Sequence, residues 1–341
     1  MKYRKSIWKN KKRGERKPMA KNTFLLSVIY VTFILTLWVP NSFALNAVAS
    51  IKNFQGQIEI ERGHTRLSGR TGLILYDKDM VVTGKTGKVT IAFRDGSLIR
   101  LFTNTRFLIE KSVESKKGSR RFLNQFFLKI GSFWGKFTKK YQNTVIRTPT
   151  ATAGIKGTIV ALAERNDKLS VSLSSGAVTV TNDDDTFDLQ PGQIVTEITR
   201  QGSIRDKIKS LPFHLVIKAD QTEIKVPEPE EEIEVFFTLQ MVQKKSNRNA
   251  FRTGPVYVSH AFDNIQFSTD IHLNERGYAR IKGIVRPFKG ENSFRETIDI
   301  MMIMDGEAFL DVEAGHTRLI FVQTGAKAKT LKIDVNSDKM D

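Results

Sequence analysis

The chain has 341 residues, of which 40% are hydrophobic, and it carries a formal net charge of +18. This length leaves room for two ordinary domains, and this hydrophobic content supports folded cores and argues against intrinsic disorder. The absence of cysteine excludes disulfides, thiolate metal sites, a cysteine nucleophile and a lipid-modified cysteine.

The first 44 residues combine a basic segment with an apolar one. Residues 1–21 hold ten Lys or Arg and one acid, and residues 23–39 form an uncharged run of 17 residues. The sequence Ser42-Phe43-Ala44 then suits cleavage after Ala44. We expect an apolar signal or anchor helix, and hence export to the periplasm or cell surface, or alternatively anchoring in the inner membrane by residues 23–39. A start at Met19 would leave a leader of 26 residues.

Residues 45–200 show short apolar–polar alternations that are interrupted by Gly, Asn or Asp, as in 58–63 and 169–173. A period of two residues predicts strands. Consecutive short strands without a helical stretch between them favour an all-β sandwich, roll or short solenoid.

The segment 148–160 joins a strand-breaking Thr-Pro pair to a glycine-punctuated stretch. Pro149 lacks an N–H and suits the start or edge of a strand, while Gly154 and Gly157 permit backbone conformations that side chains disfavour. The segment predicts a strand, a tight corner and a second strand.

Further blocks lie at 79–84, 89–101, 176–180 and 189–193. In their order and spacing these blocks resemble the FecR-type domain. That resemblance implies a β-sandwich or roll over residues 45–200, in a family that includes iron-dicitrate sensors, which relay a signal from an outer-membrane transporter to a cytoplasmic sigma factor. It also gives structural roles to the motif residues Asp95, Gly96, Thr148, Pro149, Gly157, Thr158, Gly176 and Gly192.

A basic and aromatic insertion runs from residue 111 to residue 147. Basic residues interleaved with aromatic ones bind nucleic acid or anionic polymers. The other interpretation is that the aromatic residues form the core side of two strands and that Lys and Arg face water. We expect no nucleic-acid partner, and the candidate contacts with an envelope protein or glycan are Arg120, Arg121, Trp134, Lys139 and Lys140.

Residues 201–232 are predicted to be a connector, because two prolines among clustered acids at 225–234 make a stiff, solvated linker. Strand patterns return in residues 233–341 with a spacing typical of a β-sandwich. The part from 281 to 335 resembles bacterial immunoglobulin-like modules. The predicted strands are 235–239, 256–258, 279–285, 297–303, 308–312, 318–322 and 330–335.

No catalytic motif is evident in the sequence. The five histidines are far apart, and none has a zinc-protease or hydrolase spacing. Asn182–Asp185 lacks the acid spacing of a calcium loop, and Asp95-Gly96 is a preferred hairpin turn, so both are interpreted as turns. We therefore expect a protein that is not an enzyme and that has no cofactor or metal.

Two functions remain open from the sequence. One is an exported FecR-domain protein that binds an envelope protein or glycan as a scaffold, with membrane contact only through its N-terminal segment. The other is a membrane-anchored regulator of a sigma factor. The second is disfavoured because the basic segment before the apolar run is only 21 residues long, whereas regulators of that kind carry a cytoplasmic domain of several tens of residues there.

Overall fold

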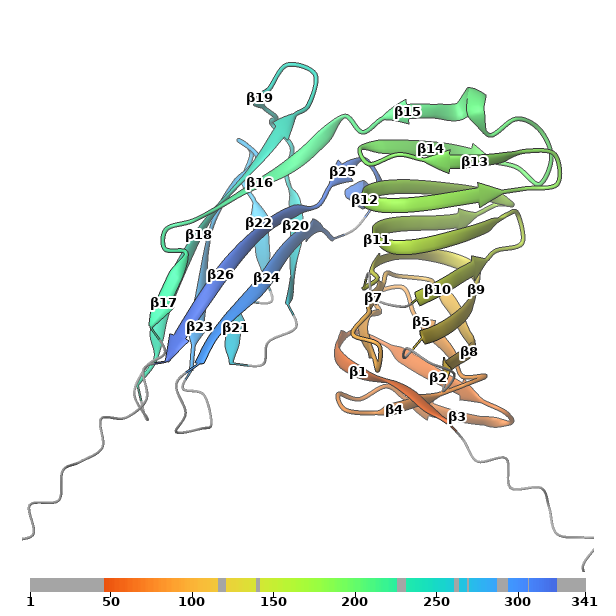
Figure 1. Ribbon diagram of the computed structural model, residues 1–341, viewed down its shortest axis with the longest axis horizontal. Coiled ribbons are helices and arrows are strands. Elements are labelled where there is room, and N and C mark those ends of the chain that lie inside the picture. The colour runs from red at the N-terminus through yellow and green to blue at the C-terminus, as the bar shows by residue number, and fades with distance from the viewer. Residues whose placement is uncertain are drawn as a thin grey trace, which may run out of the picture. The chain divides into compact units, whose positions relative to one another are not determined.

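A computed structural model describes residues 46–115, 121–138, 142–225, 231–260, 264–268, 270–286, 294–305 and 307–323 (Figure 1). Every described residue lies within one compact unit, Asn46–Asp341. The predicted N-terminal helix and strand 330–335 therefore lie outside the described residues. Within the described ranges, no helix has the length and apolarity needed to span a membrane.

The first region, residues 46–210, is a single 15-stranded sheet. The order along its main path is β15-β14-β12-β11-β10-β9-β7-β6-β1-β4, and β10 to β15 follow one another along one direction in Figure 1. The first strands are β1 (Ala47–Gln55), β2 (Ile58–Arg62), β3 (Thr65–Ser68), β4 (Ile74–Tyr76), β5 (Met80–Thr83), β6 (Lys88–Phe93), β7 (Leu98–Leu101) and β8 (Arg106–Ser115). The others are β9 (Arg121–Lys136), β10 (Gln142–Arg147), β11 (Thr152–Arg165), β12 (Lys168–Thr181), β13 (Thr186–Leu189), β14 (Gln193–Ile198) and β15 (Ile208–Ser210).

Strand β9 organises the first region because it changes partners along its length. Its first part pairs with β8 and, in parallel, with β10, whereas its second part pairs with β7 and β11. Four aromatic side chains of the basic insertion are buried, Phe126, Phe133, Trp134 and Phe137. The rings of Phe126 and Phe133 both pack against Phe107. The interpretation of these aromatics as core residues is confirmed.

The long hairpin of β11 and β12 contains a bulge. The register between the strands shifts after Lys156, where Gly157 has φ +57° and Gly176 opposite it has φ +89°. A Cβ on Gly176 would lie 2.4 Å from the Gly157 carbonyl oxygen. The two strands can approach each other here only because both positions are glycine.

The second region, residues 211–323, contains a six-stranded and a five-stranded sheet. Their main paths are β21-β23-β18-β16-β25 and β17-β26-β24-β20-β22, and β19 pairs with β18. Buried side chains from both sheets form one apolar cluster. The strands are β16 (Phe213–Ala219), β17 (Glu223–Lys225), β18 (Ile233–Gln243), β19 (Arg248–Asn249), β20 (Gly254–His260), β21 (Ile265–Phe267), β22 (Ile271–Leu273), β23 (Tyr278–Val285), β24 (Phe294–Met304), β25 (Val312–Glu313) and β26 (Gly315–Gln323).

Two predictions for this part of the chain were wrong. The predicted connector 201–232 contains the short 3-10 helix η1 (Arg205–Lys207) and three strands, of which β15 completes the first sheet and β16 pairs with β18 along its whole length. The pairing partners of β16 are distant in sequence, so its own weak pattern did not reveal it. The predicted strand 308–312 is mostly a 3-10 helix, η2 (Glu307–Leu310), followed by β25. The linker residues 226–230 lie outside the described residues.

Candidate functional site

A corner lies at residues 148–151, between β10 and β11. The prediction of a strand, a corner and a strand within 148–160 was wrong in position, because Gly154 and Gly157 lie inside β11, where the chain forms a bulge instead of a turn. The Thr148 hydroxyl accepts hydrogen bonds from the backbone N–H groups of Thr150 and Ala151, and the Thr150 hydroxyl donates to Glu164 Oε1 at 2.7 Å. Glu164 is 2% exposed, and burial raises the pKa of its carboxyl despite the hydrogen bond from Thr150. The corner is therefore built by hydroxyl groups around a buried carboxyl group.

The other motif residues also have structural roles. Gly96, with φ +84°, forms the turn between β6 and β7, where Asp95 Oδ1 accepts the backbone N–H of Ser97 at 2.8 Å. Thr158 donates its hydroxyl to the Ala177 carbonyl at the bulge of β11. Pro149 and Gly192 both lie in turns. The Pro149 carbonyl accepts a hydrogen bond from Arg200 Nη2, and Gly192 has a φ of +80°. The hairpin-turn interpretation of Asp95-Gly96 is confirmed.

The acidic segment Asn182–Asp185 is the tip of the β12–β13 hairpin, as the pairing of Thr181 with Thr186 shows. Asn182 Oδ1 accepts the backbone N–H groups of Asp184 and Asp185. Asp185 accepts the N–H of Ile204, and this hydrogen bond lowers the pKa of its carboxyl. These side chains hold the tip against the loop before η1, and the turn interpretation is confirmed.

Of the five predicted contact residues, the structure describes the side-chain surroundings of Trp134 alone. Trp134 is 3% exposed and belongs to the apolar cluster shared by the two regions. Its assignment to a contact surface was wrong, because the outward side of β9 is covered by the second region. Arg121 is the first residue of β9, and Arg120, Lys139 and Lys140 lie outside the described residues.

A buried polar cluster joins the two regions. Arg100 of β7 donates two hydrogen bonds to Asp305, from Nη2 at 3.0 Å and from Nε at 3.3 Å, and Lys88 Nζ lies 3.0 Å from Asp305 Oδ2. The Arg100 guanidinium also lies 3.7 Å from the centroid of the Tyr257 ring. Arg100 and Asp305 are 6% and 7% exposed, so this ion pair is shielded from water and is sensitive to the loss of either partner.

The pKa of Asp305 reflects opposing effects. Burial raises it, but the positive charges and hydrogen bonds of Arg100 and Lys88 outweigh burial and hold it below its ordinary value. Asp305 is therefore a carboxylate at neutral pH and compensates the buried guanidinium. The sequence pattern alone did not predict this cluster, although the charge of Arg100 within the apolar run Leu98–Leu101 is a signal that could have indicated it.

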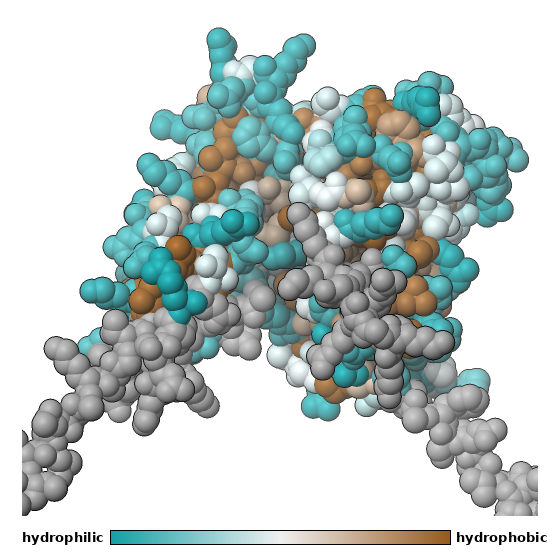
Figure 2. Space-filling model, in the orientation of Figure 1, coloured by the Kyte–Doolittle hydropathy of each residue, from teal (hydrophilic) through white to brown (hydrophobic). Residues whose placement is uncertain are grey.

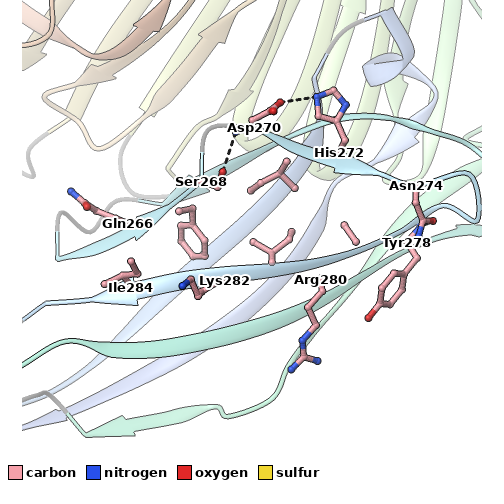
Figure 3. A pocket seen from close by; sticks show the side chains of 13 residues that line it. Gln266, Ser268, Asp270, His272, Asn274, Tyr278, Arg280, Lys282 and Ile284 are labelled. Carbon is pink, nitrogen blue, oxygen red and sulfur yellow. Dashed lines mark hydrogen bonds and ion pairs between the residues drawn. The ribbon is translucent and has the colours of Figure 1, made fainter.

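An open groove lies in the second region, where the chain crosses from one sheet to the other. Strand β21 pairs with β23, whereas β22, a few residues later, pairs with β20 of the opposite sheet. The cavity that opens between β22 and β23 has a volume of about 720 Å³. Figure 3 shows its rim side chains arriving from β22 on one side and β23 on the other. The lining residues are Gln266, Phe267, Ser268, Asp270, Ile271, His272, Asn274, Tyr278, Ala279, Arg280, Ile281, Lys282 and Ile284.

The groove has an apolar floor and a polar rim. Phe267, Ile271 and Ile281 contribute to the apolar cluster of the second region or pack against it. Both cations that β23 places on the rim are paired with a carboxylate: Lys282 lies 2.8 Å from Glu234, and Arg280 is bonded to Asp220. On β22, His272 Nε2 lies 2.9 Å from Asp270. The rim therefore offers polar contacts with little uncompensated positive charge.

Metal-binding clusters are absent from the part of the chain that the structure describes, where no three His, Cys, Asp or Glu side chains come together. The histidines are dispersed among separate elements. His214 lies on β16, His260 on β20, His272 on β22 and His316 on β26, while His64 lies in the turn between β2 and β3.

The fold and these sites define a two-region all-β protein whose motif residues shape corners and bulges. Residues 79–179 match the family model described as FecR protein. The chain therefore carries a FecR-type domain, as its motif residues predicted. A comparison with curated proteins found no match.

Similarities to solved structures are distant. A proposed anti-sigma factor from Parabacteroides distasonis aligns with a TM-score of 0.32 and 14% identity, over 38% of this chain and 59% of that one. A PapD-like domain of human CEP192 aligns with a TM-score of 0.24 and 13% identity, over 33% of this chain and 87% of that one. The VesB protease of Vibrio cholerae aligns with a TM-score of 0.20 and 8% identity, over 80% of this chain and 99% of that one. Likeness at this level does not assign a function.

Proposed function

We propose that this protein is a non-enzymatic binding protein of the cell envelope, in which the FecR-type region and an immunoglobulin-like sandwich act as one scaffold. The observation that carries the proposal is the open groove between β22 and β23. Its volume lies within the range of about 300–1,000 Å³ that is common for small-ligand sites. The basic segment and the apolar run before residue 45 support export.

The groove favours an uncharged polar ligand, and we assign it a glycan. An apolar floor that includes Phe267 suits the apolar face of a sugar ring. The side-chain amide of Gln266 makes no hydrogen bond to the rest of the described chain. The two rim cations are each paired with a carboxylate, so a strongly anionic ligand would gain little there. Exposed ion pairs of this kind contribute little stability, which leaves them available to exchange partners.

Binding of the full-length chain to envelope glycan fragments would test this proposal by isothermal titration calorimetry. We expect Gln266→Ala and His272→Ala to weaken binding about tenfold each, equivalent to the loss of one hydrogen bond of about 1.4 kcal/mol. Lys218→Ala is a matched control, because Lys218 is exposed on β16 outside the groove. Wild-type protein that binds no envelope glycan, or that binds equally well after both groove substitutions, would contradict the proposal.

The alternative function is regulation of a sigma factor by a membrane-anchored chain. The match of residues 79–179 to the FecR protein family favours it, since the resemblance implies a relay role. Deletion of residues 2–18 provides the test. A sigma-dependent transcript that remains unchanged in the deletion strain would exclude the regulator function, and a changed transcript would support it.

A further inference from the structure

One exposed aromatic residue stands apart from all other apolar side chains on the described surface. Phe251 is 81% exposed, whereas no other exposed large hydrophobic residue in the described ranges exceeds 45%. Such an exposed phenyl ring is not seated in a cleft of its own chain. It is available to enter an apolar partner.

The position of Phe251 is fixed by its two neighbours. Ala250 is buried, and its N–H donates to the Met241 carbonyl at 2.9 Å. The Arg252 guanidinium lies 5.1 Å from the Phe213 ring centroid and 3.6 Å from Asp311. Because both flanking residues are anchored, the outward direction of the phenyl ring is a property of the fold.

The segment that carries this ring also carries unpaired cations. The segment 243–254, which joins β18 to β20 through β19, contains four Lys or Arg and no acid. Lys244 and Arg252 pair with Glu313 and Asp311, but Lys245 and Arg248 are exposed and have no ion pair within the described ranges. Figure 2 shows hydrophilic side chains projecting from the end of the second region, where Figure 1 places β19.

A third exposed cation, Arg276, lies close to the same segment. The Gln240 amide donates to the Arg276 carbonyl, and the Met241 N–H donates to the carbonyl of the next residue, Gly277. Met241 also accepts the N–H of Ala250, so the turn at Arg276 and the chain at Phe251 meet at one strand end. Glu275 is the acid beside them. The exposed ring and the three exposed cations form the Phe251 patch, which consists of Lys245, Arg248, Phe251 and Arg276.

We propose that the Phe251 patch docks the second region onto an anionic lipid bilayer. The ring would enter the interfacial layer while the cations contact anionic headgroups, which is the usual combination at membrane surfaces. Four side chains are too few for a stable protein interface, which needs roughly 20–30 residues on each side. A bilayer deforms around a projecting side chain and needs no preformed cleft.

The chain lacks cysteine, which allows a single probe to report on this surface in the full-length protein. Ser246→Cys, in the exposed turn between β18 and β19, would carry an environment-sensitive fluorophore and leave Phe251 intact. Phosphatidylcholine vesicles with and without phosphatidylglycerol would then be added. The apolar run 23–39 could bring the chain to both kinds of vesicle, but only docking of the patch would move the probe into an apolar environment.

We expect a blue shift with phosphatidylglycerol vesicles that salt reduces and that phosphatidylcholine does not produce. Phe251→Ser should abolish the shift, and Lys245→Glu with Arg248→Glu should weaken the apparent affinity by at least about fivefold per cation removed. Val216→Ser, an exposed apolar position on β16, should leave the shift unchanged. Equal shifts with both vesicle types would overturn the proposal. So would a response to soluble polyglutamate that is insensitive to Phe251→Ser, because that result would assign the patch to an acidic polymer.

Discussion

The two regions bury their apolar residues in different ways. The first region encloses a cluster of its own, and its strands bend at glycine bulges. In the second region, strand β23 alternates between buried and exposed residues, whereas every residue from Ile300 to Met304 on β24 is buried. A strand with alternating burial has one face in water, and a continuously buried strand has both faces covered.

The cover on the outer face of β24 comes from the first region. Asp299 of β24 lies 3.7 Å from Lys136 of β9, and Ile303 pairs with Tyr257, whose ring contacts Arg100. Successive side chains on a strand point to opposite faces, so Met301 and Ile303 share the face of Asp299. The second region thus depends on the first to cover this apolar surface, and its boundary is not that of an independent module.

The largest effect is expected at the buried ion pair that joins the regions. Asp305→Ala leaves Arg100 buried without its counter-charge, and we expect a loss of about 3–5 kcal/mol in the free energy of unfolding, measured by urea denaturation. The double variant Arg100→Met with Asp305→Leu removes the buried pair and leaves only the more exposed Lys88 without its partner, so it should lose less. Equal losses in the single and double variants would show that the pair does not join the regions as described.

A smaller effect, confined to the first region, is expected at the bulge. Gly176→Ala places a Cβ 2.4 Å from a backbone oxygen at φ +89°, and we expect a loss of about 2–3 kcal/mol in unfolding free energy. Gly202→Ala is the matched control, because Gly202 has φ +97° and open space around it. A loss at Gly176 no greater than that at Gly202 would mean that the strands can separate at the bulge.

Acid should weaken the contact between the regions. Because the pKa of Asp305 is held below its value of 3.8 in an unfolded chain, the ion pair stabilises the fold above about pH 4 and loses this contribution as the pH falls through the folded-state pKa. We expect wild-type protein to lose more stability below about pH 4 than the Arg100→Met, Asp305→Leu variant. Parallel pH profiles of the two proteins would contradict this origin of acid sensitivity.

The smallest effect is expected at the corner of the first region. Burial raises the pKa of Glu164, so the native state favours the protonated carboxyl group. The stability that this protonated group contributes is lost as the pH rises through the folded-state pKa. Glu164→Gln keeps an acceptor for Thr150 and removes the buried charge, and should raise stability at neutral pH by about 0.5–1 kcal/mol. Thermal unfolding of both proteins at neutral and acidic pH measures this difference in stability. If Glu164→Gln is less stable than the wild-type protein at neutral pH, the charge of Glu164 is compensated in the native state.

The sequence alone determined the all-β class, the FecR-type domain and the local geometry at its motifs. The sequence indicated the strand alternation, the Asp95-Gly96 turn and the strand break at Thr148-Pro149, because turns and strand periods depend on residues that are close together along the chain. Part of the candidate site was also readable, since the strand that contains Arg280 and Lys282 was predicted correctly. The groove itself could not be predicted from the sequence, because it forms where β21 and β22 join opposite sheets.

Only the tertiary structure decided which faces are covered. Trp134 has the pattern of an accessible aromatic among basic residues, yet it is buried at the contact of the two regions, in an apolar cluster whose other members lie mostly in the second region. Arg100 and Asp305 are 205 positions apart and became partners only through that contact. Local sequence specifies backbone conformation and the alternation of side chains, whereas burial on the second face of a strand depends on distant segments whose pairing no short pattern encodes.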